Sequence, residues 1–366
     1  MAPRANVCQD GLKWRKNQPS ASMSPSTAPA WRKLPKALLH EHLDGGLRPQ
    51  TLLELCRSRG VQVPARDADA LAQWMHANAN SGSLERYLRG FAITIAAMAT
   101  EAACERVAYE AAEDAREDGC VLAEFRMAPL LLEPHGLAGE AVVEAVLAGL
   151  ARSSLRCGLI VCGMRTDNSA DTERSAHLAV RYRDRGVIGF DLAGAERYFP
   201  PSDHEEAMII ARDGGLGLTC HAGESDSGDR VLEAAGLGAT RIGHGIHIVL
   251  GETQKQTDEW VEVARGLGLH FEVCPSSNVH TGAVSSLEVH PIRAMIAAGL
   301  SVSCSTDNRL MSGVTLSSEL EALHTRTGLA MGELANLQRA GVAASFLPQP
   351  DRDAAMAEVE AGWPRT

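Results

Sequence analysis

Short apolar runs that contain β-branched residues alternate with longer stretches of helical pattern along most of the chain. Strands that alternate with helices form a parallel sheet, and eight such units predict a closed (β/α)8 TIM barrel. Two of the stretches predicted to be helical are Ser175–Arg185 and Leu287–Ala298. The eight predicted strands are Ala37–His42, Val121–Phe125, Leu159–Gly163, Val187–Asp191, Leu216–His221, Thr240–His244, Leu269–Cys274 and Ser301–Ser305.

A long interval interrupts this alternation between the first two strands. It comprises 78 residues, from Leu43 to Cys120, and its Pro49 is typical of the first turn of a helix. Four apolar residues within it are spaced as on one face of a helix. They are Leu84, Tyr87, Leu88 and Phe91. Such a stripe usually packs into a core, but an insertion after the first strand of a barrel lies at its mouth. We therefore expect a helical insertion that forms a lid.

Composition narrows the class of protein. Residues 34–360 are predicted to form one barrel domain, and residues 1–30, rich in Ser, Pro and Ala, a disordered tail. A net charge of -11 argues against nucleic acid and anionic membranes as partners. Nine cysteines without a C-x-x-C pair favour a reducing, cytoplasmic location, and no apolar run is long enough to cross a bilayer. The sequence does not specify an oligomeric state.

Polar residues with metal-binding and acid–base chemistry stand at the ends of four predicted strands. Alternation along a strand puts His40 and His42 on the same face. A barrel brings all strand ends to one rim, so residues far apart in the chain are expected to meet there. Three imidazoles and one carboxylate suit Zn²⁺ better than Mg²⁺ or Ca²⁺, which prefer oxygen ligands. The residues at the strand ends are His40, His42, His221, Glu224, His244 and Asp307.

These residues lie in motifs that resemble those of the adenosine deaminase family, and its bacterial branch in particular. The resemblance covers the chain from Leu34 to Pro348. The motifs follow in the family's order: Leu34–Gly45 (LPKALLHEHLDG), Met164-Arg165, Asp191–Gly194 (DLAG), His221–Glu224 (HAGE), Arg241–Gly245 (RIGHG), Cys274–Asn278 (CPSSN), Thr281–Ala283 (TGA), Ser305–Asp307 (STD) and Ser345–Pro348 (SFLP).

The resemblance implies a reaction and a role for each residue. One zinc ion per chain would be bound by His40, His42, His221 and Asp307. Glu224 would protonate N1 of a purine nucleoside. His244 would orient and deprotonate the attacking water, with Asp307 on its other side. The backbone N–H of Gly194 would bind N3, Asp44 would hold a ribose hydroxyl, and the stripe of Leu84, Tyr87, Leu88 and Phe91 would be the lid. Adenosine and deoxyadenosine are the expected substrates, converted to inosine nucleosides and ammonia.

Two departures from the family pattern bear on the substrate. Asn308 stands where many members have a second Asp that faces N7, and an amide can donate to that acceptor at any pH. The loop Ser225–Asp229 is short and polar, which predicts a more open pocket edge.

Three alternative functions remain open. The first is the same chemistry on adenine, on a 5′-modified adenosine or on another adenosine-type biosynthetic intermediate. AMP is less favoured, because no cluster of Arg and Lys is placed to hold a phosphate. The second is a non-catalytic barrel that binds nucleosides. The third is a zinc hydrolase that acts on a lactam or ester.

The first prediction concerns the N-terminal tail, within which Met23 is a possible translation start. A chain that starts at Met23 should keep its melting temperature within a few degrees and its activity within about twofold, because residues 1–22 cannot bury enough apolar surface to fold. Thermal melts and rates of both chains test this. A large loss of either in the shortened chain would refute it.

Overall fold

Eight parallel strands form a closed barrel in chain order, which confirms the predicted (β/α)8 fold. The computed structural model describes residues 28–82, 87 and 90–363. Asp307, just after the last strand, closes the barrel by exchanging backbone hydrogen bonds of 2.9 and 2.8 Å with His40 and His42. The strands are β1 (Lys36–His42), β2 (Cys120–Met127), β3 (Arg156–Met164), β4 (Val187–Ala193), β5 (Gly217–Ala222), β6 (Arg241–His244), β7 (His270–Val273) and β8 (Ser301–Cys304).

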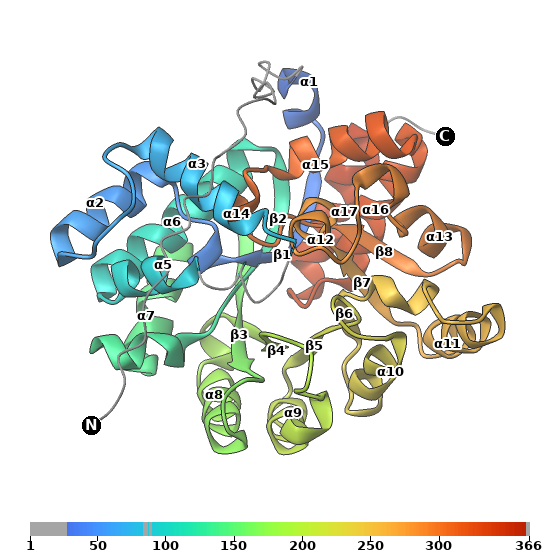
Figure 1. Ribbon diagram of the computed structural model, residues 1–366, viewed down its shortest axis with the longest axis horizontal. Helices are drawn as coiled ribbons and strands as arrows, with labels where there is room; N and C mark the ends of the chain where they lie inside the picture. Colours follow the sequence, from blue (N-terminus) through green and yellow to red (C-terminus); the bar gives the residue numbers. More distant parts are fainter. Residues whose placement is uncertain (1–27, 83–86, 88–89, 364–366) are drawn as a thin grey trace, which may run out of the picture.

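Helices surround the strands on the outside of the barrel (Figure 1). The short helix α1 includes residues 28–30 of the predicted tail, whereas residues 1–27 lie outside the described part of the chain. The helices are α1 (Ala28–Arg32), α2 (Pro49–Arg59), α3 (Ala68–Ala79), α5 (Phe91–Met98), α6 (Glu101–Glu117), α7 (Gly139–Leu150), α8 (Ser169–Arg181), α9 (Glu205–Asp213), α10 (Gly228–Gly236), α11 (Gln254–Gly266), α12 (Pro275–His280), α13 (Ile292–Ala297), α14 (Arg309–Ser312), α15 (Leu316–Ala322), α16 (Met331–Ala344) and α17 (Gln349–Gly362).

The interval after β1 is helical, as predicted. It contains α2, α3, α5 and α6, which lie together on one side of the barrel (Figure 1). Tyr87 and Phe91 from the predicted apolar stripe are buried, with 2% and 9% of their surface exposed. The other two members of the stripe, Leu84 and Leu88, lie outside the described residues.

The stretch Leu287–Ala298 differs from the single helix that its pattern predicts. It consists of a 3-10 turn, η6 (Leu287–Val289), followed by α13, and His290 and Pro291 lie between them. The residue before a proline is disfavoured in helical conformation, and His290 is accordingly extended, with φ −62° and ψ 132°. This break places the His290 side chain outside either helix.

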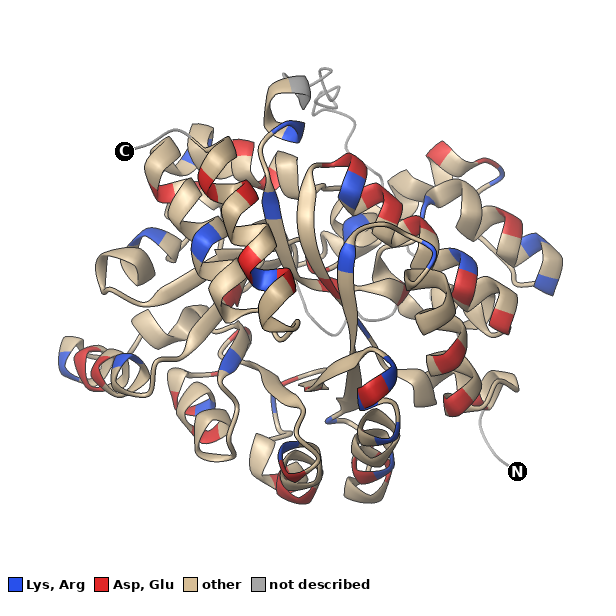
Figure 2. Cartoon of the chain, turned by 180° about the vertical axis from the view of Figure 1, so that it is seen from behind, with Lys and Arg blue, Asp and Glu red and all other residues tan. Residues whose placement is uncertain are grey.

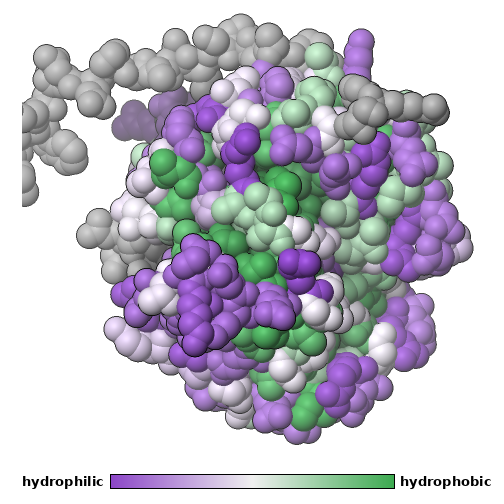
Figure 3. Space-filling model, turned by 90° about the vertical axis from the view of Figure 1, so that its right-hand side faces the viewer, coloured by the Kyte–Doolittle hydropathy of each residue, from purple (hydrophilic) through white to green (hydrophobic). Residues whose placement is uncertain are grey.

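Charged side chains lie largely on the surrounding helices, with acidic and basic residues interspersed (Figure 2). On the face that contains α11 and α13, hydrophobic and hydrophilic residues are mixed (Figure 3). Among the described residues, no helix is both long enough and apolar enough to cross a membrane. The cysteines within the described ranges are free thiols.

The packing of α7 on α6 generates a prediction about stability. A methyl group on Gly149 of α7 would overlap the carbonyl oxygen of Glu105 and lie 2.9 Å from Ala108 Cβ. Overpacking of this kind costs about 1–3 kcal/mol, so Gly149→Ala should lower the free energy of unfolding by that amount in urea melts. Gly236→Ala is the control, because its added methyl group meets nothing within 4 Å. Equal stability of the two variants would contradict the prediction.

Candidate functional site

Imidazole rings and a carboxylate converge at the carboxyl ends of the strands. Potential ligand atoms of His40, His221, His244 and Asp307 all lie within 4.8 Å of one another. His42 adjoins them, because its Nε2 is 3.2 Å from His221 Nε2 and 3.5 Å from Asp307 Oδ1. The barrel therefore brings together the four ligands expected from the sequence, with His244 beside them.

Two of the imidazoles have their protonated nitrogen fixed by a buried carboxylate. His40 Nδ1 donates to Glu272 Oε2 at 2.9 Å, and His221 Nδ1 donates to Asp191 Oδ1 at 3.1 Å. Each Nε2 therefore keeps a lone pair that is directed into the cluster. His40 Nε2 is buried 3.4 Å from Asp307 Oδ1 and has no hydrogen-bond partner among the described residues. The lone pairs of these atoms repel one another in a buried site unless a cation lies between them. This set of nitrogen and oxygen ligands therefore fits a metal ion.

Burial and hydrogen bonding favour the protonation states that a metal site needs. Burial lowers the pKa of His42 well below its usual value, so this ring is neutral at pH 7. Asp307 Oδ2 accepts a hydrogen bond of 2.6 Å from Ser277 Oγ.

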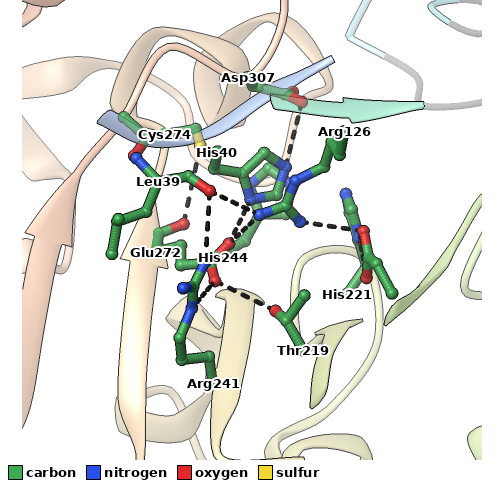
Figure 4. Close-up of polar contacts among 12 residues, drawn as sticks. Leu39, His40, Arg126, Thr219, His221, Arg241, His244, Glu272, Cys274 and Asp307 are labelled. Atoms are coloured by element: carbon green, nitrogen blue, oxygen red, sulfur yellow. Dashed lines mark hydrogen bonds and ion pairs between the residues drawn. The ribbon is translucent and has the colours of Figure 1, made fainter. Parts of the chain in front are cut away.

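A buried ionic network lies directly beneath the cluster (Figure 4). Glu272 accepts from Arg126 Nη2 at 2.5 Å, Arg241 Nε at 2.6 Å and Thr219 Oγ1 at 3.1 Å. Arg126 also pairs with Asp191 at 2.9 Å. Burial alone would raise the pKa of Glu272, but the two guanidinium groups hold it well below its usual range. Both carboxylates that orient the imidazoles are thus held in place and ionised.

Two of the site residues have left-handed backbone conformations. The φ angles of His244 and Asp307 are 63° and 61°, in a region that costs a residue with a side chain about 1–3 kcal/mol. Both residues stand where a strand ends and the chain turns outward. The strain directs their side chains into the shared site, and the hydrogen bonds around them maintain it.

Glu224 faces the cluster from the loop after β5. Its Oε1 accepts from Thr281 Oγ1 at 3.0 Å, and its Oε2 lies 3.7 Å from His244 Nε2. The loop is held by one buried side chain, Glu196, whose carboxylate accepts from four consecutive backbone N–H groups, those of residues 223–226. Glu224 is consequently fixed at both its backbone and its carboxylate.

A cavity of about 260 Å³ lies over the cluster and Glu224. The residues expected to recognise the substrate, as far as the structure describes them, line it: Asp44, Gly194, Asn308, Tyr87 and Phe91. Asp44 Oδ1 and Asn308 Oδ1 are buried and have no hydrogen-bond partner among the described residues. Burial raises the pKa of Asp44 to about 7. The remaining lining is mainly apolar, including Ile95, Ala128, Leu131, Cys162 and Met164, so the cavity suits a largely apolar ligand with a few polar groups.

Sequence reasoning missed the residues that support the site. Glu272 and Arg126 carry charges inside apolar strands, and such charges are buried only when paired, so this signal could have identified them. Asn278 and Ser277 were recognised only as parts of a motif. Glu196 had no local signal, because its partners are backbone groups about 30 residues away.

Comparisons with known proteins point to one family. The sequence profile described as adenosine deaminase matches residues 35–362. The chain is 42% identical to an adenosine deaminase from Mycolicibacterium gilvum, over 92% of this chain and 97% of that protein. It is 40% identical to an adenosine deaminase from Mycobacterium avium, over 90% and 94%.

Solved structures give the same fold. The structure is similar to that of an adenine deaminase from Arthrobacter aurescens, with a TM-score of 0.82 and 26% identity. The similarity covers 90% of this chain and 98% of that one.

The convergent acceptors predict that the protein binds one divalent ion per chain. His221→Ala removes one acceptor, so after dialysis the wild-type protein should hold about one ion per chain and the variant much less than one. Elemental analysis of both proteins measures this. His177→Ala, on the exposed face of α8, is the control and should keep its ion. Active wild-type protein without bound metal would contradict the prediction.

Proposed function

Because the chain belongs to the adenosine deaminase family, we propose that it hydrolyses adenosine and deoxyadenosine to the corresponding inosine nucleosides and ammonia. The observation that carries this proposal is the set of convergent acceptors beside Glu224, under a mainly apolar cavity of about 260 Å³. A screen of purified protein against adenosine, deoxyadenosine, adenine, AMP and 5′-modified adenosines tests it. Inactivity on every nucleoside would overturn it.

We take the ion to be zinc, one per chain, held by His40, His42, His221 and Asp307. Three neutral imidazoles with one carboxylate form a typical donor set for catalytic zinc, whereas Mg²⁺ and Ca²⁺ prefer oxygen. Bound zinc would lower the pKa of a water molecule toward 7 and so supply a nucleophile at neutral pH.

The remaining side chains divide the chemistry between them. Glu224 places a proton on N1 of the purine, which withdraws electrons from C6 and opens it to attack by water. Thr281 holds the carboxylate for this transfer through its hydrogen bond to Oε1. His244 and Asp307 orient the attacking water from two sides, and Ser277 fixes the Asp307 carboxylate.

Recognition of the nucleoside falls to the residues around the cavity. The backbone N–H of Gly194 donates to N3, the amide of Asn308 donates to N7, and Asp44 accepts from a ribose hydroxyl. The rings of Tyr87 and Phe91 cover the base. The proposal extends the same covering role to Leu84 and Leu88, which lie outside the described residues.

Adenine is the second candidate substrate, because the similar structure from Arthrobacter aurescens is named an adenine deaminase. The same ion and the same Glu224 would serve either substrate. The buried Asp44 carboxylate favours a nucleoside, because adenine would leave it without a partner.

The role of Glu224 predicts the effect of removing its acidic proton. Glu224→Gln should fold and keep its ion but lose about 10²–10⁴-fold in rate, because an amide can bind N1 but cannot protonate it. Steady-state kinetics and metal content of the purified variant measure this. Glu259→Gln, in the exposed part of α11, is the control. More than about a tenth of the wild-type rate in Glu224→Gln, with normal metal content, would refute the role.

The position of Asp44 predicts the order of substrates. Adenosine should exceed both adenine and AMP in kcat/KM, because Asp44 accepts from the ribose and repels a 5′-phosphate. Asp44→Ala should lower kcat/KM for adenosine at least about tenfold and change that for adenine much less. Kinetics of both proteins on the three substrates decide the point. A wild-type preference for adenine or AMP, or an unchanged preference in the variant, would show that Asp44 does not recognise the ribose.

A further inference from the structure

A chain of hydrogen bonds runs from the start of α13 to the ring of His244. The backbone N–H of Ile292 donates to His290 Nδ1 at 3.1 Å. His290 Nε2 lies 3.2 Å from Asn278 Oδ1. Asn278 Nδ2 in turn lies 3.0 Å from His244 Nδ1. All three side chains are buried, and Asn278 and His244 are at most 1% exposed.

The backbone donor fixes the direction of every bond in this chain. The N–H of Ile292 can only donate, so His290 Nδ1 accepts and the ring carries its proton on Nε2. Burial lowers the pKa of His290 to about 3, so the ring is neutral at pH 7. Its Nε2–H donates to the oxygen of Asn278, which leaves the NH₂ group facing His244 Nδ1. His244 Nδ1 must therefore accept, and the proton of the neutral ring resides on Nε2.

The position of Glu224 supports the same assignment. His244 Nε2 lies 3.7 Å from Glu224 Oε2, so a proton on this nitrogen faces a carboxylate oxygen. A lone pair on Nε2 would instead draw the acidic proton of Glu224 toward His244 and away from N1 of the purine, where the proposed function needs it. Both sides of the ring thus favour a proton on Nε2.

We propose that Asn278 and His290 are positioning residues that hold His244 as the tautomer with its proton on Nε2. In this state His244 presents a hydrogen-bond donor to the cavity. It orients the attacking water by donating to the water oxygen. The sequence expectation that His244 also deprotonates the water needs a lone pair on Nε2, which this tautomer lacks. Bound zinc would instead lower the pKa of the water enough for it to release that proton to solvent before it attacks C6. The kinetic consequences rest on the proposed deaminase function, whereas the tautomer itself does not.

The decisive experiment locates the proton directly. Full-length protein with ¹⁵N-labelled histidine side chains is studied by NMR, which detects the one-bond coupling between nitrogen and hydrogen. We expect this coupling at Nε2 of His244 and not at Nδ1. In Asn278→Asp a carboxylate oxygen replaces the amide donor, so a proton should appear on Nδ1. A wild-type proton on Nδ1, or an unchanged proton in the variant, would overturn the proposal.

Kinetics then test whether the tautomer matters for the reaction. Asn278→Asp should lower kcat for adenosine by about 10²-fold and change KM less than about threefold, because the substrate contacts remain. A variant with the proton moved and kcat within about twofold of wild type would overturn the proposed role. If wild-type protein is inactive on adenosine, the proposed function fails and the NMR result still decides the tautomer.

Variants of His290 keep the test valid if Asn278→Asp does not fold. In His290→Gln the amide can donate to Asn278 Oδ1, so the His244 tautomer and most of the rate should persist. In His290→Leu this donor is lost, and kcat should fall at least about tenfold. Equal kcat in these two variants would refute the proposed positioning role of His290. His270→Gln is the matched control: this buried histidine lies between Ser301 and Ser303 at the opposite end of the barrel and should leave the tautomer and kcat unchanged.

Discussion

The site depends on one carboxylate in the centre of the barrel, that of Glu272. It accepts hydrogen bonds from Arg126 and Arg241 and from the imidazole of His40, so it links strands β1, β2, β6 and β7. A buried charge of this kind is stable only with its partners, and removing one partner costs about 3–5 kcal/mol. The side chains inside the barrel are therefore held in place by ion pairs as well as by apolar packing. The same network sets the orientation of the imidazoles in the metal-binding cluster.

Sequence reasoning predicted the barrel and the convergence of the site because both follow from local signals. Eight apolar runs predict the strands, four of them end in polar residues with metal-binding or acid–base chemistry, and barrel topology alone brings these ends together. The supporting residues were not predictable in this way, since their partners are distant in the chain. His290 illustrates the limit: the pattern predicts a helix through it, but Pro291 breaks that helix and leaves the ring free to bind Asn278.

One short helix, α12, contacts three groups to which we assign chemistry. Ser277 donates to Asp307, the amide of Asn278 faces His244, and Thr281 at its end donates to Glu224. Because these contacts come from little more than one helical turn, the three groups share a common rigid support. One element thus aligns the side chains of Glu224, His244 and Asp307 relative to one another.

The walls of the cavity have separate origins, and this separation bears on how the fold diversifies. Glu224, His244 and Asp307 line the cavity from the loop after β5, from β6 and from the segment after β8, whereas Tyr87, Phe91 and Ile95 come from the insertion after β1. Substitutions in the insertion can reshape the space around a sugar or a base without disturbing the aligned acid and imidazole. The shape of the cavity can therefore change through the insertion while the groups on the opposite wall that carry the chemistry stay in place.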